Sequence, residues 1–190
     1  MPYEFKRSGN EKESRFQILS LDGGGIKGIF SAAVLAAIEE DLSLDVIDHF
    51  ELIAGTSTGG IIAIALGLGM KPREIVEFYV HEGPRIFPRW GGMKWWQHWA
   101  YRKFSPAPLA AALQSCFKDK RFGESTKRLV IPSYNLGEDD VYIFRTPHHE
   151  RLRRDCKVPA WKVAFRPGDC RARPMHSMVH ARPCAAVPIR

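Results

Sequence analysis

Ser57 is the residue of this chain whose surroundings best suit covalent chemistry. It is the central residue of Gly55-Thr-Ser-Thr-Gly59, a Gly-x-Ser-x-Gly pattern. When such a pattern joins a strand to a helix, its small flanking residues let the backbone turn sharply and expose the serine hydroxyl. An exposed and activated serine attacks acyl carbonyl groups. The alternative is a turn rich in glycine and serine that only connects two elements.

A second glycine-rich segment offers what such a serine would need. Gly23, Gly24 and Gly25 follow a short apolar run, and a carbonyl group can approach their backbone closely because glycine has no Cβ. Backbone N–H groups aimed at the developing oxyanion accelerate acyl transfer. The same segment also matches Gly-x-Gly-x-x-Gly through Gly28, which is a dinucleotide-binding pattern.

The nucleotide-binding alternatives lack their remaining residues. A dinucleotide fold places an acidic residue at the end of the second strand; here that place holds GTSTGG, and Asp45 and Asp48 come before the strand. A phosphate-binding P-loop needs a Gly-Lys-Ser/Thr sequence, which does not follow these glycines. The four cysteines lack the paired spacing typical of zinc sites. We therefore expect neither a metal nor an organic cofactor.

The expected elements place both glycine segments at one edge of a sheet. The sequence predicts strands over residues 16–21 and 50–55, an amphipathic helix from Ile26, and an apolar helix that follows Ser57. Ligands usually bind where parallel strands end, and both segments lie at strand ends. Alternating strands and helices with apolar strands predict an α/β fold, namely a three-layer sandwich with a mainly parallel sheet.

The remaining elements are predicted from shorter signals. Pro72 suits the first turn of a third helix, and a fourth helix is expected over residues 109–117. Residues 128–136 and 141–146 form an expected hairpin, and a last helix begins within residues 157–164. Leu52–Met70 is uncharged over nineteen residues, which also allows a transmembrane interpretation. Its five glycines favour a buried strand, a turn and a buried helix instead.

Residues 85–104 combine aromatic and basic side chains. Four tryptophans and a tyrosine alternate with arginines and lysines in this segment. Such mixtures favour a lipid interface, so we expect peripheral membrane contact here. The alternative is a surface loop whose tryptophans pack on the body of the protein.

Charge and the amino terminus limit the partners and the compartment. The net charge of +7 comes from residues 151–190, which hold ten Lys and Arg against two Asp, so it does not indicate a nucleic-acid partner for the chain as a whole. The amino-terminal residues are polar and charged, unlike a signal peptide. We therefore expect a cytoplasmic protein with peripheral contact at the inner face of the membrane.

The two glycine segments together resemble those of the patatin-like phospholipases. "SLDGGGIKG" followed by "GTSTGG" carries the resemblance, and "EIVEFYVHEGPRIFP" is similar to the bacterial branch that includes cyclic-nucleotide-activated effectors. The resemblance covers residues 16–164 and implies hydrolysis of membrane-lipid acyl esters by a serine and an aspartate, without a catalytic histidine. It implies that Ser57 is the nucleophile and that Lys27 occupies a commonly basic position. The implied oxyanion hole comprises Gly23, Gly24 and Gly25, and Gly28, Gly55 and Gly59 are further motif glycines.

The sequence departs from this family pattern after the serine. The family's Asp-Gly-Gly or Asp-Gly-Ala motif is missing, because no aspartate after Ser57 is followed by glycine. We expect a polar extension over residues 1–15, an incomplete hydrolase domain over 16–164 and an unstructured or out-of-frame basic tail over 165–190. A truncation or a lost reading frame at the carboxyl end would explain the missing motif, the change of composition near residue 165 and the basic charge of the tail. The alternative function is that of a catalytically inactive fragment that binds lipid or membrane.

Overall fold

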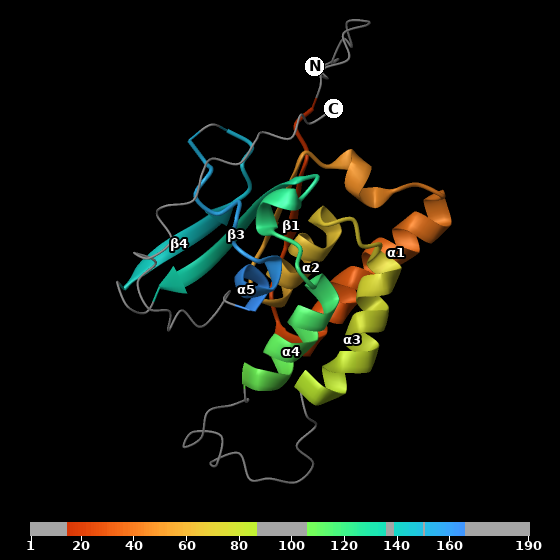
Figure 1. The fold of residues 1–190 in the computed structure, drawn as a ribbon. Coiled ribbons are helices and arrows are strands. Elements are labelled where there is room, and N and C mark those ends of the chain that lie inside the picture. Colours follow the sequence, from red (N-terminus) through yellow and green to blue (C-terminus); the bar gives the residue numbers. More distant parts are fainter. Residues whose placement is uncertain (1–14, 87–105, 136–138, 150, 166–190) are drawn as a thin grey trace, which may run out of the picture.

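The computed structural model describes residues 15–86, 106–135, 139–149 and 151–165 (Figure 1). Its strands are β1 (Ile18–Leu21), β2 (Leu52–Gly55), β3 (Arg128–Asn135) and β4 (Asp140–Arg145). Its α-helices are α1 (Gly28–Leu42), α2 (Thr58–Gly67), α3 (Pro72–Ile86), α4 (Pro106–Phe117) and α5 (Ala160–Phe165). Short 3-10 turns cover Gly25–Lys27, Val46–His49 and Phe122–Glu124.

The sheet has the strand order β1-β2-β3-β4 and is mainly parallel. β1, β2 and β3 are parallel, whereas β4 returns antiparallel to β3 as the predicted hairpin. Leu21, the last residue of β1, pairs with Gly55, the last residue of β2. The segments that follow these two strands therefore leave the sheet side by side, which confirms the predicted α/β arrangement.

The described helices gather on one face of the sheet (Figure 1). α2 packs against the three parallel strands, and α1, α3 and α5 pack against α2. The usual right-handed crossovers from β1 to β2 and from β2 to β3 run in the same direction, so they bring their helices to the same side. On the other face Ile18 is 56% exposed and Val130 is half-buried. The third layer of the predicted sandwich is not among the described elements and stays a prediction.

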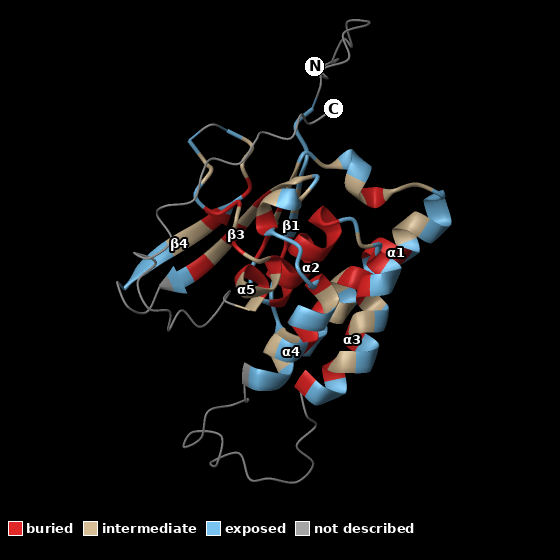
Figure 2. Ribbon diagram, viewed as in Figure 1, coloured by how far each residue is buried: buried red, intermediate tan, exposed pale blue. Residues whose placement is uncertain are grey.

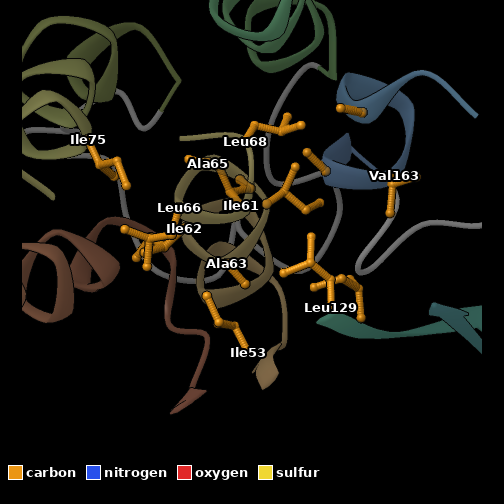
Figure 3. Close-up of a cluster of buried hydrophobic side chains, with 14 of the residues drawn as sticks. Ile53, Ile61, Ile62, Ala63, Ala65, Leu66, Leu68, Ile75, Leu129 and Val163 are labelled. Atoms are coloured by element: carbon orange, nitrogen blue, oxygen red, sulfur yellow. The ribbon is translucent and has the colours of Figure 1, made fainter. Parts of the chain in front are cut away.

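α2 forms the centre of the hydrophobic core because its sequence is apolar on every side. All ten of its residues are buried (Figure 2). Figure 3 shows Ile53 and Leu129 of the sheet on one side of α2 and Ile75 of α3 on another. Burying one such Ile or Leu side chain contributes about 1.5–3 kcal/mol to stability. The packing of α2 therefore fixes the position of the turn at Ser57, directly before its first residue.

Most predicted elements are confirmed with boundaries shifted by a few residues. α3 begins at Pro72 as expected, and Leu52–Met70 divides into β2, a turn and α2. None of the helices in the described ranges is long and apolar enough to cross a bilayer. Nearly all of the segment 85–104, the extension over residues 1–15 and the tail over 165–190 lies outside the described residues, so the predictions made for them stay predictions.

Candidate active site

Ser57 lies at the sharp turn between β2 and α2. Its backbone has φ 52° and ψ −123°, a conformation that residues with a side chain rarely adopt. The Ser57 carbonyl oxygen accepts the N–H of Ile61 at 3.2 Å, so the first hydrogen bond of α2 begins at this serine. Ser57 itself is exposed. The turn thus presents the hydroxyl at the positive end of a buried helix.

The glycines that flank the serine allow this turn to pack against β1. A Cβ atom at Gly59 would lie 2.1 Å from the carbonyl oxygen of Leu21, and one at Gly55 would lie 2.4 Å from the carbonyl oxygen of Gly59. Both distances are far below van der Waals contact. Glycine at these two places therefore lets the helix start directly at the end of the sheet.

The glycine loop over residues 23–25 lies against the serine turn. A Cβ atom at Gly23 would lie 2.6 Å from Ser57 Cβ and 2.6 Å from the carbonyl oxygen of Thr56. Gly25 has φ 62° and begins the 3-10 turn that leads into α1. The structure therefore places the loop of Gly23, Gly24 and Gly25 beside the Ser57 turn, with Gly23 closest to the serine.

Lys27 and Gly28 complete this loop. The N–H of Lys27 donates to the carbonyl oxygen of Gly24 at 3.3 Å, and the Lys27 side chain is exposed. A Cβ atom at Gly28 would lie 2.9 Å from Thr58 Cβ, so α1 starts in close contact with the first residue of α2. Both ends of the loop are thereby attached to the core.

Three side chains at this site were missed by sequence reasoning. The N–H of Gly23 donates to Thr56 Oγ1 at 3.2 Å, and the N–H of Gly24 donates to Thr58 Oγ1 at 3.1 Å. The buried hydroxyl of Tyr79, on α3, donates to the carbonyl oxygen of Thr58 at 3.3 Å, and burial raises the pKa of Tyr79 well above its usual value. The only signal in the sequence was a threonine on each side of the serine.

Asp155 and His148, near β4, have hydrogen-bond partners there and not at the Ser57 turn. Asp155 is buried and accepts the hydroxyl of Tyr142 at 2.5 Å and the N–H of Arg145 at 3.1 Å. Burial and this hydrogen bond raise the pKa of Tyr142 to about 12. His148 lies 3.4 Å from the hydroxyl of Thr146, and burial lowers its pKa. β4 is two strands from β2, roughly 10 Å away across the sheet.

Within the described ranges, no carboxylate is hydrogen-bonded to the Ser57 hydroxyl. Asp22, directly before the glycine loop, is exposed and has no side-chain hydrogen bond to the described residues. The described residues also contain no group of three or more side chains that could hold a metal ion. Among the described residues, the site thus consists of Ser57, the amino terminus of α2 and the glycine loop packed against them.

A family model and individual related proteins both identify the same family. A model of the family "Patatin-like phospholipase" matches residues 19–189. The chain is 33% identical over 150 residues to a cGAMP-activated phospholipase of Escherichia coli, covering 74% of this chain and 42% of that protein. It is 31% identical over 155 residues to a protein of the same name from Pseudomonas aeruginosa, covering 79% of this chain and 45% of the relative.

A plant relative extends the comparison beyond bacteria. Patatin-like protein 4 of Arabidopsis thaliana is 34% identical over 150 residues, which cover 69% of this chain and 37% of the plant protein. The chain spans less than half the length of each of these relatives. Because the family model covers most of the chain and both glycine segments, the chain belongs to the patatin-like phospholipase family.

Proposed function

We propose that this chain is a serine acyl hydrolase that cleaves ester bonds of membrane lipids. The observation that carries the proposal is the strained and exposed turn at Ser57, held against the glycine loop. Backbone strain at an exposed serine between a strand and a helix is typical of a nucleophile. Family membership gives the substrate class, since the related proteins are named phospholipases.

The chemistry follows from the arrangement of these groups. Ser57 Oγ attacks the acyl carbonyl carbon, and the carbonyl oxygen becomes an oxyanion that backbone N–H groups of the glycine loop stabilise. The C–O bond to the lipid alcohol then breaks, and the alcohol leaves with a proton. Water attacks the acyl-serine, releases the fatty acid and restores the hydroxyl. The resemblance assigns the proton transfers to an aspartate of an Asp-Gly-Gly or Asp-Gly-Ala motif after the serine. The Asp-Gly-Gly of this chain, at Asp22, belongs to the glycine loop, and no aspartate after Ser57 is followed by glycine.

The test is the release of fatty acid from vesicles of phosphatidylglycerol and phosphatidylethanolamine by the whole chain. Mass spectrometry is expected to find free fatty acid and lysophospholipid in equal amounts, because one acyl ester is cleaved at each turnover. Release of a phosphorylated headgroup, or no product at any protein concentration, would contradict the proposal. Binding to the vesicles without any product would favour the alternative of a lipid-binding remnant.

We further propose that the lipid surface meets the amino-terminal part of α1. Phe30 and Val34 are four residues apart, which places them on one side of α1, and Ile26 precedes them by four residues in the 3-10 turn. Ile26, Phe30 and Val34 are 43%, 72% and 40% exposed. This apolar stripe starts within the glycine loop, one residue from Gly25. Its neighbour Lys27 is exposed and can contact lipid phosphate. An acyl ester that reaches Ser57 from a bilayer would bring this stripe against the membrane.

Phe30→Asp is expected to weaken vesicle binding about tenfold or more. Withdrawing a large aromatic side chain from an apolar environment costs roughly 1.5–3 kcal/mol, and the added carboxylate is repelled by anionic lipid. The measurement is the vesicle-bound fraction in a flotation assay. The matched control is Leu42→Asp, which changes another exposed apolar residue, 64% exposed, at the other end of α1, roughly 18 Å away. Equal losses in both variants would show that the stripe has no special part in binding.

A further inference from the structure

The two threonines beside Ser57 already occupy part of the glycine loop. Thr56 Oγ1 accepts the N–H of Gly23 at 3.2 Å, and Thr58 Oγ1 accepts the N–H of Gly24 at 3.1 Å. An amide donates its proton in one direction, so these two N–H groups point away from a substrate oxygen. Two of the three amides first expected to form the oxyanion hole are therefore engaged within the protein.

The next amides of the loop are free to donate. The N–H groups of Gly25 and Ile26 have no acceptor among the described residues, since they open a 3-10 turn whose first hydrogen bond is donated by Lys27. We propose that Thr58, with Thr56, holds the glycine loop in place and that Gly25 is the first oxyanion donor of this loop. This inference rests on the proposed function and narrows the set of donors within it.

Thr58 is better placed than Thr56 to fix the loop. Its side chain is 4% exposed, whereas Thr56 is exposed. Its carbonyl oxygen is held by Tyr79 of α3, and Gly28 at the start of α1 approaches it so closely that a Cβ there would lie 3.0 Å from Thr58 Oγ1. Thr58 thus connects the first turn of α2 with α1, α3 and the loop. It acts on the reaction through Gly24 and is a positioning residue.

The test removes the hydroxyl and keeps the shape of the side chain. Thr58→Val is expected to lower kcat for a soluble ester, p-nitrophenyl butyrate, about tenfold to a hundredfold, with KM changed by less than about threefold. A displaced oxyanion donor affects the transition state more than substrate binding, which produces this split. Thr58→Ser retains the oxygen and is expected to restore most of the lost kcat.

Amide hydrogen exchange provides a second measurement that does not depend on turnover. In the native chain, Gly25 N–H is expected to exchange faster than Gly24 N–H, because only the latter has an acceptor. In Thr58→Val, exchange at Gly24 is expected to rise about three- to tenfold, as one hydrogen bond is lost, while Gly25 changes little. NMR of the labelled chain resolves both amides.

Thr146→Val is the matched control. Thr146 is 2% exposed, and its Oγ1 accepts the N–H of Leu129 at 2.9 Å. The variant Thr146→Val therefore loses a comparable buried hydrogen bond just after β4. If Thr58→Val and Thr146→Val have the same kcat and the same exchange at Gly24, the proposal is wrong. If the native chain hydrolyses no ester, the proposed function fails, but the exchange rates still test the roles of Gly24 and Gly25. Slower exchange at Gly25 than at Gly24 would show that Gly25 N–H is not the free donor, and it would overturn the assignment of Gly25 as the first oxyanion donor.

Discussion

Ser57→Ala is expected to abolish ester hydrolysis, with kcat lowered by about four to six orders of magnitude wherever the native chain has measurable turnover. The loss is this large because the hydroxyl forms the covalent intermediate. The neighbouring hydroxyls of Thr56 and Thr58 already accept the N–H groups of Gly23 and Gly24, so we do not expect them to replace it. The measurement is turnover of both p-nitrophenyl butyrate and phospholipid vesicles. Both should fall together, because the same serine acts on a soluble and on a membrane substrate.

The control for this variant separates chemistry from folding. Ser115→Ala changes an exposed serine on α4, and its turnover should equal that of the native chain. Thermal unfolding of Ser57→Ala should show a folded protein, since the Ser57 side chain makes no hydrogen bond to the described residues. Turnover that persists in folded Ser57→Ala would remove the serine mechanism and leave the fold without an assigned nucleophile.

Local residues were sufficient to predict the elements that carry the site. An apolar strand followed by Gly55-Thr-Ser-Thr-Gly59 and an apolar helix predicts a buried strand, a tight turn and a buried helix, and these became β2, the Ser57 turn and α2. Pro72 was placed correctly at the start of α3 because proline has few other places in a helix. Each of these patterns depends on a few residues that are neighbours in the sequence, so it can be recognised without knowing the fold.

The hydrogen bonds that fix the glycine loop could not be predicted in the same way. Thr58 and Gly24 are 34 residues apart, and they meet only because β1 and β2 end at the same level. A threonine beside a serine has no property in the sequence that shows which distant amide it will accept. The gathering of the described helices on one face was also missed, because it depends on the order and direction of the crossovers.

Gly59→Ala is expected to destabilise the fold by about 3 kcal/mol or more, the upper part of the range for overpacked sites. The added Cβ would lie 2.1 Å from the carbonyl oxygen of Leu21 and 2.9 Å from that of Asp22. Both contacts are with backbone, so no side chain can rotate away. The Leu21 carbonyl oxygen also accepts the N–H of Thr56 at 3.2 Å, so a displaced β1 would lose this bond beside the serine.

Urea unfolding measures this effect, and Gly24→Ala is the matched control. A Cβ atom at Gly24 would have only Lys27 Cβ nearby, at 3.7 Å, so its midpoint should stay close to that of the native chain. A large loss at Gly59 with little change at Gly24 would show that the second glycine of the serine pattern is required by packing. Since the native free energy of unfolding of a domain is about 5–15 kcal/mol, this one methyl group would remove a large part of it. Equal midpoints in the two variants would instead mean that α2 does not start as close to β1 as the structure places it.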